Sequence, residues 1–140
     1  MNIRIIVVAL LVAGVFLSGC VSSPQKAIFE SQSAVQQRSY QSRVFDTADT
    51  HQVLRTLIAT LQDIGFVIDK ADSTLGSVSA TKLDDYELRA TATVRRRGET
   101  QTLVRISAGS RHGAVTDPRL YQDFFVALEK AMFLSAQQVD

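Results

Sequence analysis

The pattern of apolar and polar positions divides the chain into three parts. Residues 5–17 are apolar apart from glycine, and residues 21–42 are rich in Ser and Gln and show no sustained period. From residue 43 onward, apolar positions recur either at every second residue or at spacings of three and four. The first period is typical of strands with one buried face, and the second of amphipathic helices. We therefore expect one folded domain, over residues 43–140.

Two amphipathic helices are predicted in this domain. The first follows Thr47-Ala48-Asp49-Thr50, whose side chains can cap a helix, and ends before Gly65, which can adopt a positive φ. The second begins at Asp117-Pro118, where Asp can be the N-cap and Pro occupies the first turn, and it runs to about Ala136. Apolar residues at helical spacing give each helix one face that is suited to a core.

Five segments are predicted to be strands: residues 42–46, 66–68, 77–82, 87–95 and 100–108. The last two alternate most cleanly, and Arg97-Gly98-Glu99 between them is too short a turn for anything but an antiparallel pair. Polar, turn-rich segments are expected at residues 69–76 and 83–85, and a loop at 109–116. The core-facing positions of the long pair are predicted to be Leu88, Ala90, Ala92, Val94, Val104, Ile106 and Ala108.

The predicted order of elements is therefore β-α-β-β-β-β-α. The alternation of the strands gives the sheet one apolar face, and two amphipathic helices are available to cover it. The expected fold class is α+β, with an antiparallel sheet, both helices packed on one of its faces and the other face exposed to water.

The apolar start of the chain resembles the signal of bacterial lipoproteins. Arg4 supplies a positive charge before the apolar run, which at about 13 residues is shorter than the roughly 20 that a transmembrane helix needs. The run ends in Leu17-Ser18-Gly19-Cys20, which resembles the lipobox of that family at every position. In these lipoproteins diacylglycerol is attached to the cysteine thiol, and the chain is cut before the cysteine.

This resemblance implies a location for the protein. It divides the chain into a signal peptide at residues 1–19, a lipidated Cys20 followed by a flexible tether to residue 42, and the domain. Two or more acyl chains, palmitate among them, give stable anchoring. Val21 stands where lipoproteins kept in the inner membrane have Asp, which favours the outer membrane with the domain in the periplasm. The covalent lipid is the only bound group that is expected, with no other cofactor.

Part of the domain resembles small periplasmic lipoprotein domains of helix-grip type. The resemblance rests on Arg43-Val44-Phe45, the amphipathic helix that follows, Asp63-Ile64-Gly65-Phe66 and Gly76-Ser77-Val78-Ser79-Ala80. The accessory lipoprotein of the outer-membrane barrel-assembly machine contains such domains, and the chain is also similar to lipoproteins that accompany efflux systems. The resemblance implies a binding or scaffolding module and assigns no catalytic residue.

Charge and composition narrow the functions further. Lys and Arg number 15 and Asp and Glu 14, and since only Arg4 precedes Cys20, the predicted mature part has 14 charges of each sign. A balanced domain is a poor candidate for nucleic-acid binding. His51 and His112 are the only histidines, and neither lies in a triad motif. No phosphate-loop or metal-binding spacing is found either, so we expect a protein that is not an enzyme and binds no metal.

One candidate partner-binding surface is the solvent face of the predicted sheet. Arg89, Arg95 and Arg105 are expected to point the same way on it, near Arg96 and Arg97 at the hairpin tip. Guanidinium groups can bind a carboxylate or a phosphate through two parallel hydrogen bonds. The alternative is an ordinary solvated face, on which Glu87 and Glu99 balance the arginines.

A second candidate surface lies on the last helix. Val126 and Phe133 are seven residues apart and fall off its apolar face, among polar residues. An exposed pair of this kind could dock a partner, although single apolar residues are common on protein surfaces.

Two functional hypotheses follow. The first is a membrane-anchored periplasmic accessory lipoprotein, a protein-binding or scaffolding module of a cell-envelope complex in transport, efflux or outer-membrane assembly. The second is a carrier or sensor of a lipid or small hydrophobic molecule held between helix and sheet. In that case Phe66, Phe124, Phe125 and Met132 would line a pocket rather than fill an ordinary core. A void between helix and sheet would separate the two hypotheses.

Overall fold

The computed structural model of the protein describes residues 33–84 and 87–136. It divides the chain into two units, Met1–Ser33 and Ala34–Asp140, and the fold below is that of the second unit. The predicted signal peptide, Cys20 and the first part of the expected tether lie outside the described residues.

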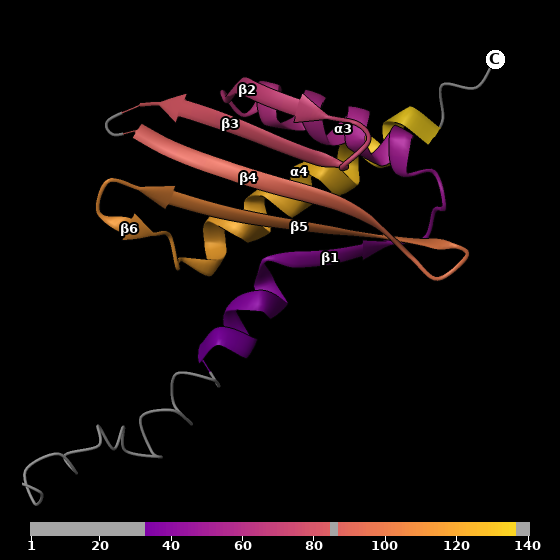
Figure 1. Ribbon diagram of the computed structural model, residues 1–140, viewed down its shortest axis with the longest axis horizontal. Coiled ribbons are helices and arrows are strands. Elements are labelled where there is room, and N and C mark those ends of the chain that lie inside the picture. Colours follow the sequence, from indigo (N-terminus) through magenta and orange to yellow (C-terminus); the bar gives the residue numbers. More distant parts are fainter. Residues whose placement is uncertain (1–32, 85–86, 137–140) are drawn as a thin grey trace, which may run out of the picture. The chain divides into compact units, whose positions relative to one another are not determined.

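The strands of this unit form a single antiparallel sheet. In chain order they are β1 (Ser42–Phe45), β2 (Val67–Asp72), β3 (Ser77–Leu83), β4 (Glu87–Arg97), β5 (Gln101–Ser110) and β6 (Gly113–Ala114). Their spatial order is β1-β5-β4-β3-β2, and β6 also pairs with β5 (Figure 1). Because β4 occupies one side of β5, β1 and β6 share the other side, with β1 near the start of β5 and β6 at its end.

Two long helices cover one face of the sheet. They are α3 (Thr50–Asp63) and α4 (Pro118–Ala136), which pack on each other and on the sheet (Figure 1). The Asp49 side chain caps α3 by accepting a hydrogen bond from the Gln52 N–H at 2.9 Å. Gly65 follows α3 with φ +92°, a conformation that glycine adopts without strain. The α+β class and the arrangement of the two helices on one face are thus confirmed.

The core lies between this face and the helices. All seven core-facing positions predicted for β4 and β5 are buried, with Val104 fully buried and Leu88 the most accessible at 7%. The helices contribute the larger side chains, of which Leu57, Phe125 and Leu128 are fully buried. None of the described helices combines the length and the apolar composition needed to cross a membrane.

Two predicted boundaries are wrong. The strand expected at residues 66–68 extends to Asp72, through residues that were predicted to be a turn. Because β2 is an edge strand with a bulge between Ile68 and Lys70, its exposed polar residues carry no alternation that a sequence pattern could reveal. The loop expected at residues 109–116 contains the end of β5 and the two-residue strand β6, which is too short to show a period.

The segment before β1 is joined to the domain through Tyr121. Residues 33–40 are helical, and the Tyr40 ring lies 5.3 Å from that of Tyr121. The buried Tyr121 hydroxyl accepts hydrogen bonds from Gln41 Nε2 at 3.2 Å and the Ala108 N–H at 3.3 Å, and it donates to the Val115 carbonyl at 2.6 Å. These contacts place Tyr40 and Gln41, at the end of the expected tether, within the packed domain.

Candidate functional site

The face of the sheet opposite the helices has no described element over it, and we refer to it as the open face. Its side chains follow from the strand register. One row across the sheet places Ser79 beside Thr91 and Thr91 beside Ser107. The next row runs from Ser77 through Thr93 and Arg105 to Ser42. The open face is therefore rich in hydroxyl and guanidinium groups, which are hydrogen-bond donors to a polar partner.

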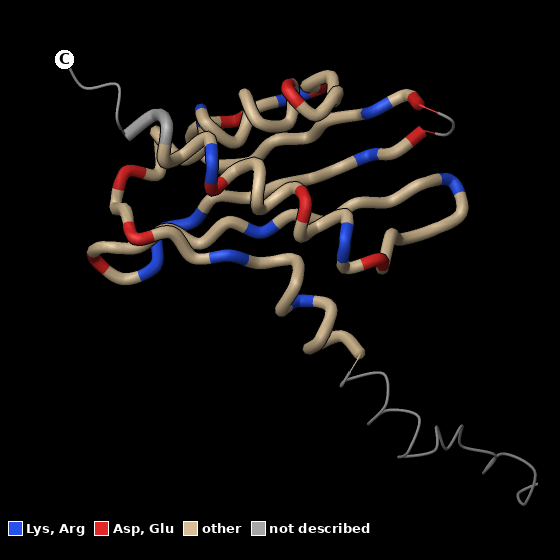
Figure 2. The backbone as a smooth tube through the Cα atoms, turned by 180° about the vertical axis from the view of Figure 1, so that it is seen from behind, with Lys and Arg blue, Asp and Glu red and all other residues tan. Residues whose placement is uncertain are grey.

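The predicted arginines share the open face but do not form one cluster. Arg89 and Arg95 are six residues apart on β4, which corresponds to about 20 Å along a strand. Arg95 donates a hydrogen bond to the Leu75 carbonyl in the β2–β3 turn, and Arg105 Nε donates to Ser42 Oγ at 3.2 Å. Figure 2 likewise shows basic positions spread along the sheet. Arg96 bonds to carbonyls of the β4–β5 turn, Gly98 O at 3.3 Å and Glu99 O at 3.1 Å.

One end of the open face contains a hollow of about 620 Å³, which we call the polar hollow. Gly109 lies directly opposite Arg89 in the β4–β5 register and contributes no side chain there. This gap leaves room between the β4 side chains and the β5–β6 turn. The polar side chains that line the hollow are Glu87, Arg89, Thr91, Ser107, Ser110 and Arg111.

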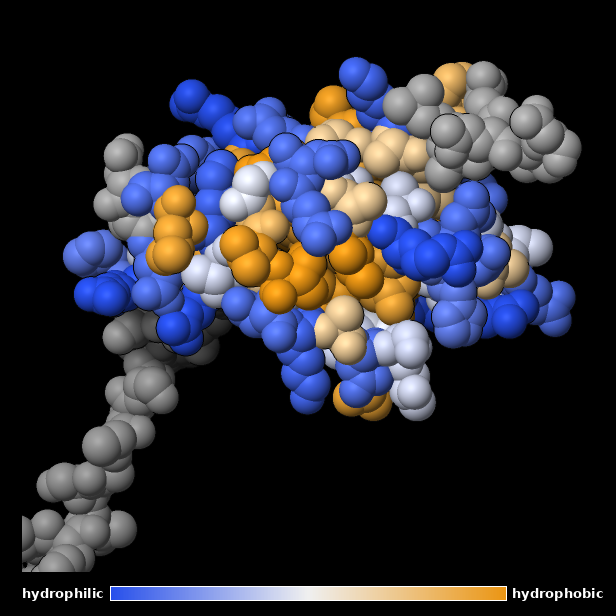
Figure 3. Space-filling model, turned by 90° about the horizontal axis from the view of Figure 1, so that it is seen from above, coloured by the Kyte–Doolittle hydropathy of each residue, from blue (hydrophilic) through white to orange (hydrophobic). Residues whose placement is uncertain are grey.

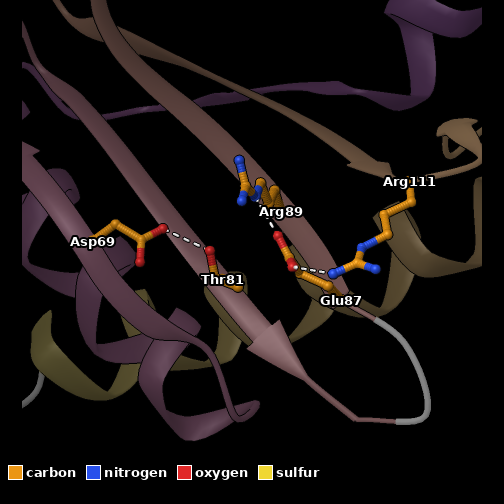
Figure 4. Close-up of polar contacts among 5 residues, drawn as sticks. All are labelled: Asp69, Thr81, Glu87, Arg89 and Arg111. Carbon is orange, nitrogen blue, oxygen red and sulfur yellow. Dashed lines mark hydrogen bonds and ion pairs between the residues drawn. The ribbon is translucent and has the colours of Figure 1, made fainter.

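Glu87 lies between two arginines in the polar hollow, as Figure 4 shows. Arg89 Nε is 2.5 Å from Glu87 Oε1, and Arg111 Nη2 is 3.8 Å from Glu87 Oε2. The Glu87 side chain is 23% exposed, whereas those of Arg89 and Arg111 are 75% and 84% exposed. The two guanidinium groups thus meet at a carboxylate that is itself partly sheltered, and the three charges sum to one positive charge.

Arg111 is the residue of this group that the sequence prediction missed. It lies in the β5–β6 turn, a segment predicted to be a plain loop, and nothing in its immediate sequence marks it. The signal that could have located the hollow is the register of the long hairpin, which places a glycine opposite Arg89 on the solvent face.

The Val126–Phe133 pair is exposed on α4. Each of the two side chains is 63% accessible to solvent. Exposure alone does not indicate what would bind them, so their role in binding stays a prediction.

A second hollow, of about 370 Å³, lies between α3, α4 and the sheet, and we call it the apolar hollow. Phe66 and Phe124, two of the four predicted lining residues, line it together with Ile64, Leu88 and Leu120. Phe125 does not, because its fully buried ring packs under Arg43 with the guanidinium carbon 5.2 Å from the ring centroid.

The rim of the apolar hollow is charged. Lys82 and Arg119 lie at it together with Asp117 and Asp123. Apolar side chains also reach the surface among polar ones on the side of the molecule nearest α3 and β2 (Figure 3).

The histidines and acidic residues form no recognisable reaction centre in the part of the chain that is described. His51 and His112 are both exposed, and they lie on α3 and in the β5–β6 turn. Among residues 33–84 and 87–136 no group of three or more His, Cys, Asp or Glu side chains could hold a metal ion. Asp69, an acidic residue of β2, accepts a hydrogen bond from Thr81 Oγ1 at 2.7 Å (Figure 4).

Comparison of the chain with known protein families and with curated proteins finds no match. The resemblances to lipoproteins therefore stay predictions from the residues that carry them.

Proposed function

We propose that the protein is a lipid-anchored accessory module of the bacterial cell envelope, whose periplasmic domain binds a partner protein through the open face. One observation carries this proposal: the helices and the core occupy one face of the sheet, while the other presents exposed arginine and hydroxyl groups. Polar rims and arginine-containing patches are common in protein interfaces. A scaffold with a rigid core behind such a face is suited to binding.

The anchor in this proposal is the lipid on Cys20. The apolar run that ends in Leu17-Ser18-Gly19-Cys20 supports it, and Val21 favours the outer membrane. Growth with a labelled fatty acid tests the anchor: the wild-type protein is expected to take up label and to fractionate with membranes, and Cys20→Ser to lose the label. Label in the Cys20→Ser protein would count against the lipidation site.

The partner in this proposal is a protein of an envelope complex in transport, efflux or outer-membrane assembly. A photo-crosslinking amino acid at Thr91, which is exposed in the middle of the open face, tests it in living cells. The same amino acid at Gln62, exposed on α3, is the matched control. We expect one discrete crosslinked product from position 91 and none from position 62. Recovery of the protein alone from position 91, or of the same product from both, would contradict the proposal.

A second candidate function, a carrier of a small hydrophobic molecule, is favoured by the apolar hollow. Its volume of about 370 Å³ lies within the usual range for ligand pockets, about 300–1,000 Å³. Leu120→Trp would fill it, and Val126→Trp would add the same side chain at an exposed position of α4 outside it. A carrier is expected to bind a fluorescent apolar probe that Leu120→Trp excludes and Val126→Trp does not. Equal binding by both variants would count against it.

A further inference from the structure

We infer that the polar hollow is a binding site for an anionic group, a phosphate or a carboxylate, and that Glu87 holds its two arginines together by standing in for that group. This inference rests on the proposed function, because the hollow is part of the open face, and it adds the chemistry of the ligand. A pair of guanidinium groups that converges on one carboxylate has the geometry with which proteins recognise such anions.

The first support is the convergence of two arginines from different segments. Arg89 comes from β4 and Arg111 from the β5–β6 turn, so the long hairpin and its following turn must both form before the two meet. The Arg89 Nε contact with Glu87, at 2.5 Å, is a charge-assisted hydrogen bond. The Arg111 contact, at 3.8 Å, is longer than a hydrogen bond. Since a guanidinium has five N–H donors, both arginines keep donors for a ligand.

The second support is the space beside them. The hollow measures about 620 Å³, within the usual range for small-ligand sites. Gly109 leaves it open opposite Arg89, and a Cβ built at this glycine would meet only the Gly113 carbonyl oxygen, at 3.6 Å. The Thr91 hydroxyl lies in its lining and can add a donor to an anion, while the Ser107 hydroxyl donates to the Thr91 carbonyl at 3.4 Å.

The third support is the local charge. Arg89 and Arg111 against Glu87 leave one net positive charge in the hollow. The carboxylate of Asp69, toward the β2 edge, is bonded to Thr81 and does not line the hollow. The other two open-face arginines bond to different groups, Arg95 to the Leu75 carbonyl and Arg105 to Ser42, so they do not converge on one carboxylate as the hollow pair does. Both hollow arginines are largely exposed, so binding should be moderate in strength and weakened by salt.

Substitution of Glu87 tests the site by the direction of the change in anion affinity. In a purely structural ion pair, removing the carboxylate would only loosen the arginines. In an anion site, the same substitution removes a negative charge that repels the bound anion. At a separation of about 4 Å between the two charges in water, this repulsion weakens the affinity about fivefold. Glu87→Gln is therefore expected to bind anions about fivefold more tightly than the wild type.

The experiment measures the thermal unfolding midpoint of the full chain in neutral detergent against inorganic phosphate and, separately, citrate, with sodium chloride at matched ionic strength as the reference. A ligand of the folded state raises the midpoint in a saturable way. The variants are Arg89→Gln, Arg111→Gln and Glu87→Gln, and Arg55→Gln is the control because it removes the same charge from an exposed position of α3.

We expect a saturable rise for the wild type and Arg55→Gln, half-saturation about fivefold lower for Glu87→Gln, and at least a fivefold loss of affinity for Arg89→Gln and Arg111→Gln. Equal rises in the two arginine variants and the wild type would overturn the inference. So would an unchanged half-saturation in Glu87→Gln, or a rise that chloride reproduces.

A second arm separates two sources of the anion. The anchored protein is placed in phosphatidylcholine vesicles with or without phosphatidylglycerol. Stabilisation by phosphatidylglycerol that Arg111→Gln abolishes supports the site and assigns it to a lipid headgroup, and stabilisation by dissolved phosphate alone supports it and assigns it to a soluble anion. If the protein binds no anion but still gives the crosslinked product from position 91, the anion site is refuted and the proposed partner binding stands. If it binds anions but gives no crosslinked product, the partner binding is refuted and the anion site stands.

Discussion

The two faces of the sheet are made from alternate residues of the same strands, and they differ sharply in burial. On β4, Ala90 and Ala92 are buried at 3% and 1% exposure, while Arg89, Thr91 and Arg95 on the other face are exposed. One face packs against two helices, which limit the volume of most of its side chains. The other is constrained only by its register and by a few polar contacts, which leaves its side chains available for recognition.

Packing on the covered face depends on small residues in the sheet. Ala80, Ala90 and Ala108 lie side by side in one row across β3, β4 and β5. Large side chains from α3 and α4 pack over this face, among them the fully buried Leu57 and Phe125. Small residues in the sheet and large ones on the helices therefore let two helices approach a short sheet closely. No described element fills the equivalent space on the open face, so a single glycine there leaves a hollow.

The largest difference between the faces is expected from truncation of a core aromatic. Phe125→Ala removes a fully buried ring and also the surface on which Arg43 lies, so it should reduce the free energy of unfolding by about 3–5 kcal/mol. Thr91→Ala, at an exposed position of the open face, is the control and should change it by no more than about 1 kcal/mol. Urea denaturation measures both, and similar losses in the two variants would remove the distinction between the faces.

A smaller effect is expected from overpacking neighbouring positions on β4. Ala92→Leu adds bulk beneath the helices at a position outside the apolar hollow and should cost about 1–3 kcal/mol. Thr91→Leu adds a similar side chain on the open face, one residue along the strand, and is expected to be close to neutral. Chemical denaturation of the pair tests the assignment of faces directly, since an inverted order would mean that the strand is turned the other way.

The rim of the covered face can be tested at Tyr121. Tyr121→Phe keeps the ring but leaves Gln41 Nε2 and the Ala108 N–H without their acceptor, which should cost about 1–3 kcal/mol. Tyr40→Phe loses one hydrogen bond at an exposed site and should cost less, about 0.5–1 kcal/mol. Hydrogen exchange of the Ala108 amide in Tyr121→Phe gives a local measure, and unchanged protection would contradict the role of the hydroxyl.

The smallest change is expected at Gly109 and has the opposite sign. The site accepts a Cβ without a close contact, so Gly109→Ala should stabilise the strand by about 0.5 kcal/mol. Gly76→Ala is the contrasting variant: Gly76 has φ +57° and its Cβ would lie 2.5 Å from the Val94 carbonyl oxygen, so it should destabilise. A stabilised Gly109→Ala with weaker phosphate binding would show that this glycine serves the hollow rather than the fold.

Most of the fold was predictable because its main elements are long and half-buried. The alternation of β4 and β5 follows from a core on one face only, and α4 begins at Asp117-Pro118 as its capping residues indicate. The extension of β2 was not predictable, because an edge strand with exposed polar residues has no required pattern. β6 was missed because a strand of two residues is too short to show an alternation of apolar and polar side chains.

The candidate site was predictable only in part. The exposure of Arg89, Arg95 and Arg105 on one face follows from their parity in the strands. The separation of Arg89 from Arg95 along β4 follows from the same count. The meeting of Arg89 and Arg111 at Glu87 does not, because Arg111 reaches Glu87 only through the path of the turn after β5. Contacts that depend on the path of a turn require the three-dimensional register.

The attachment of the chain at Tyr121 has a mechanical consequence. Any tension that reaches the domain from its N-terminal side is applied at Tyr40 and Gln41, just before β1 at an edge of the sheet. The first interactions to carry such a load are the Tyr40 contacts with Tyr121 and the Thr116 carbonyl, and then the hydrogen bond from Gln41 to Tyr121. The four-residue pairing of β1 and the ion pair between Arg43 Nε and Glu129 Oε1, at 3.3 Å, follow. β1 could therefore peel away under force and leave the other five strands and the polar hollow intact. The joint would yield before the binding surface does.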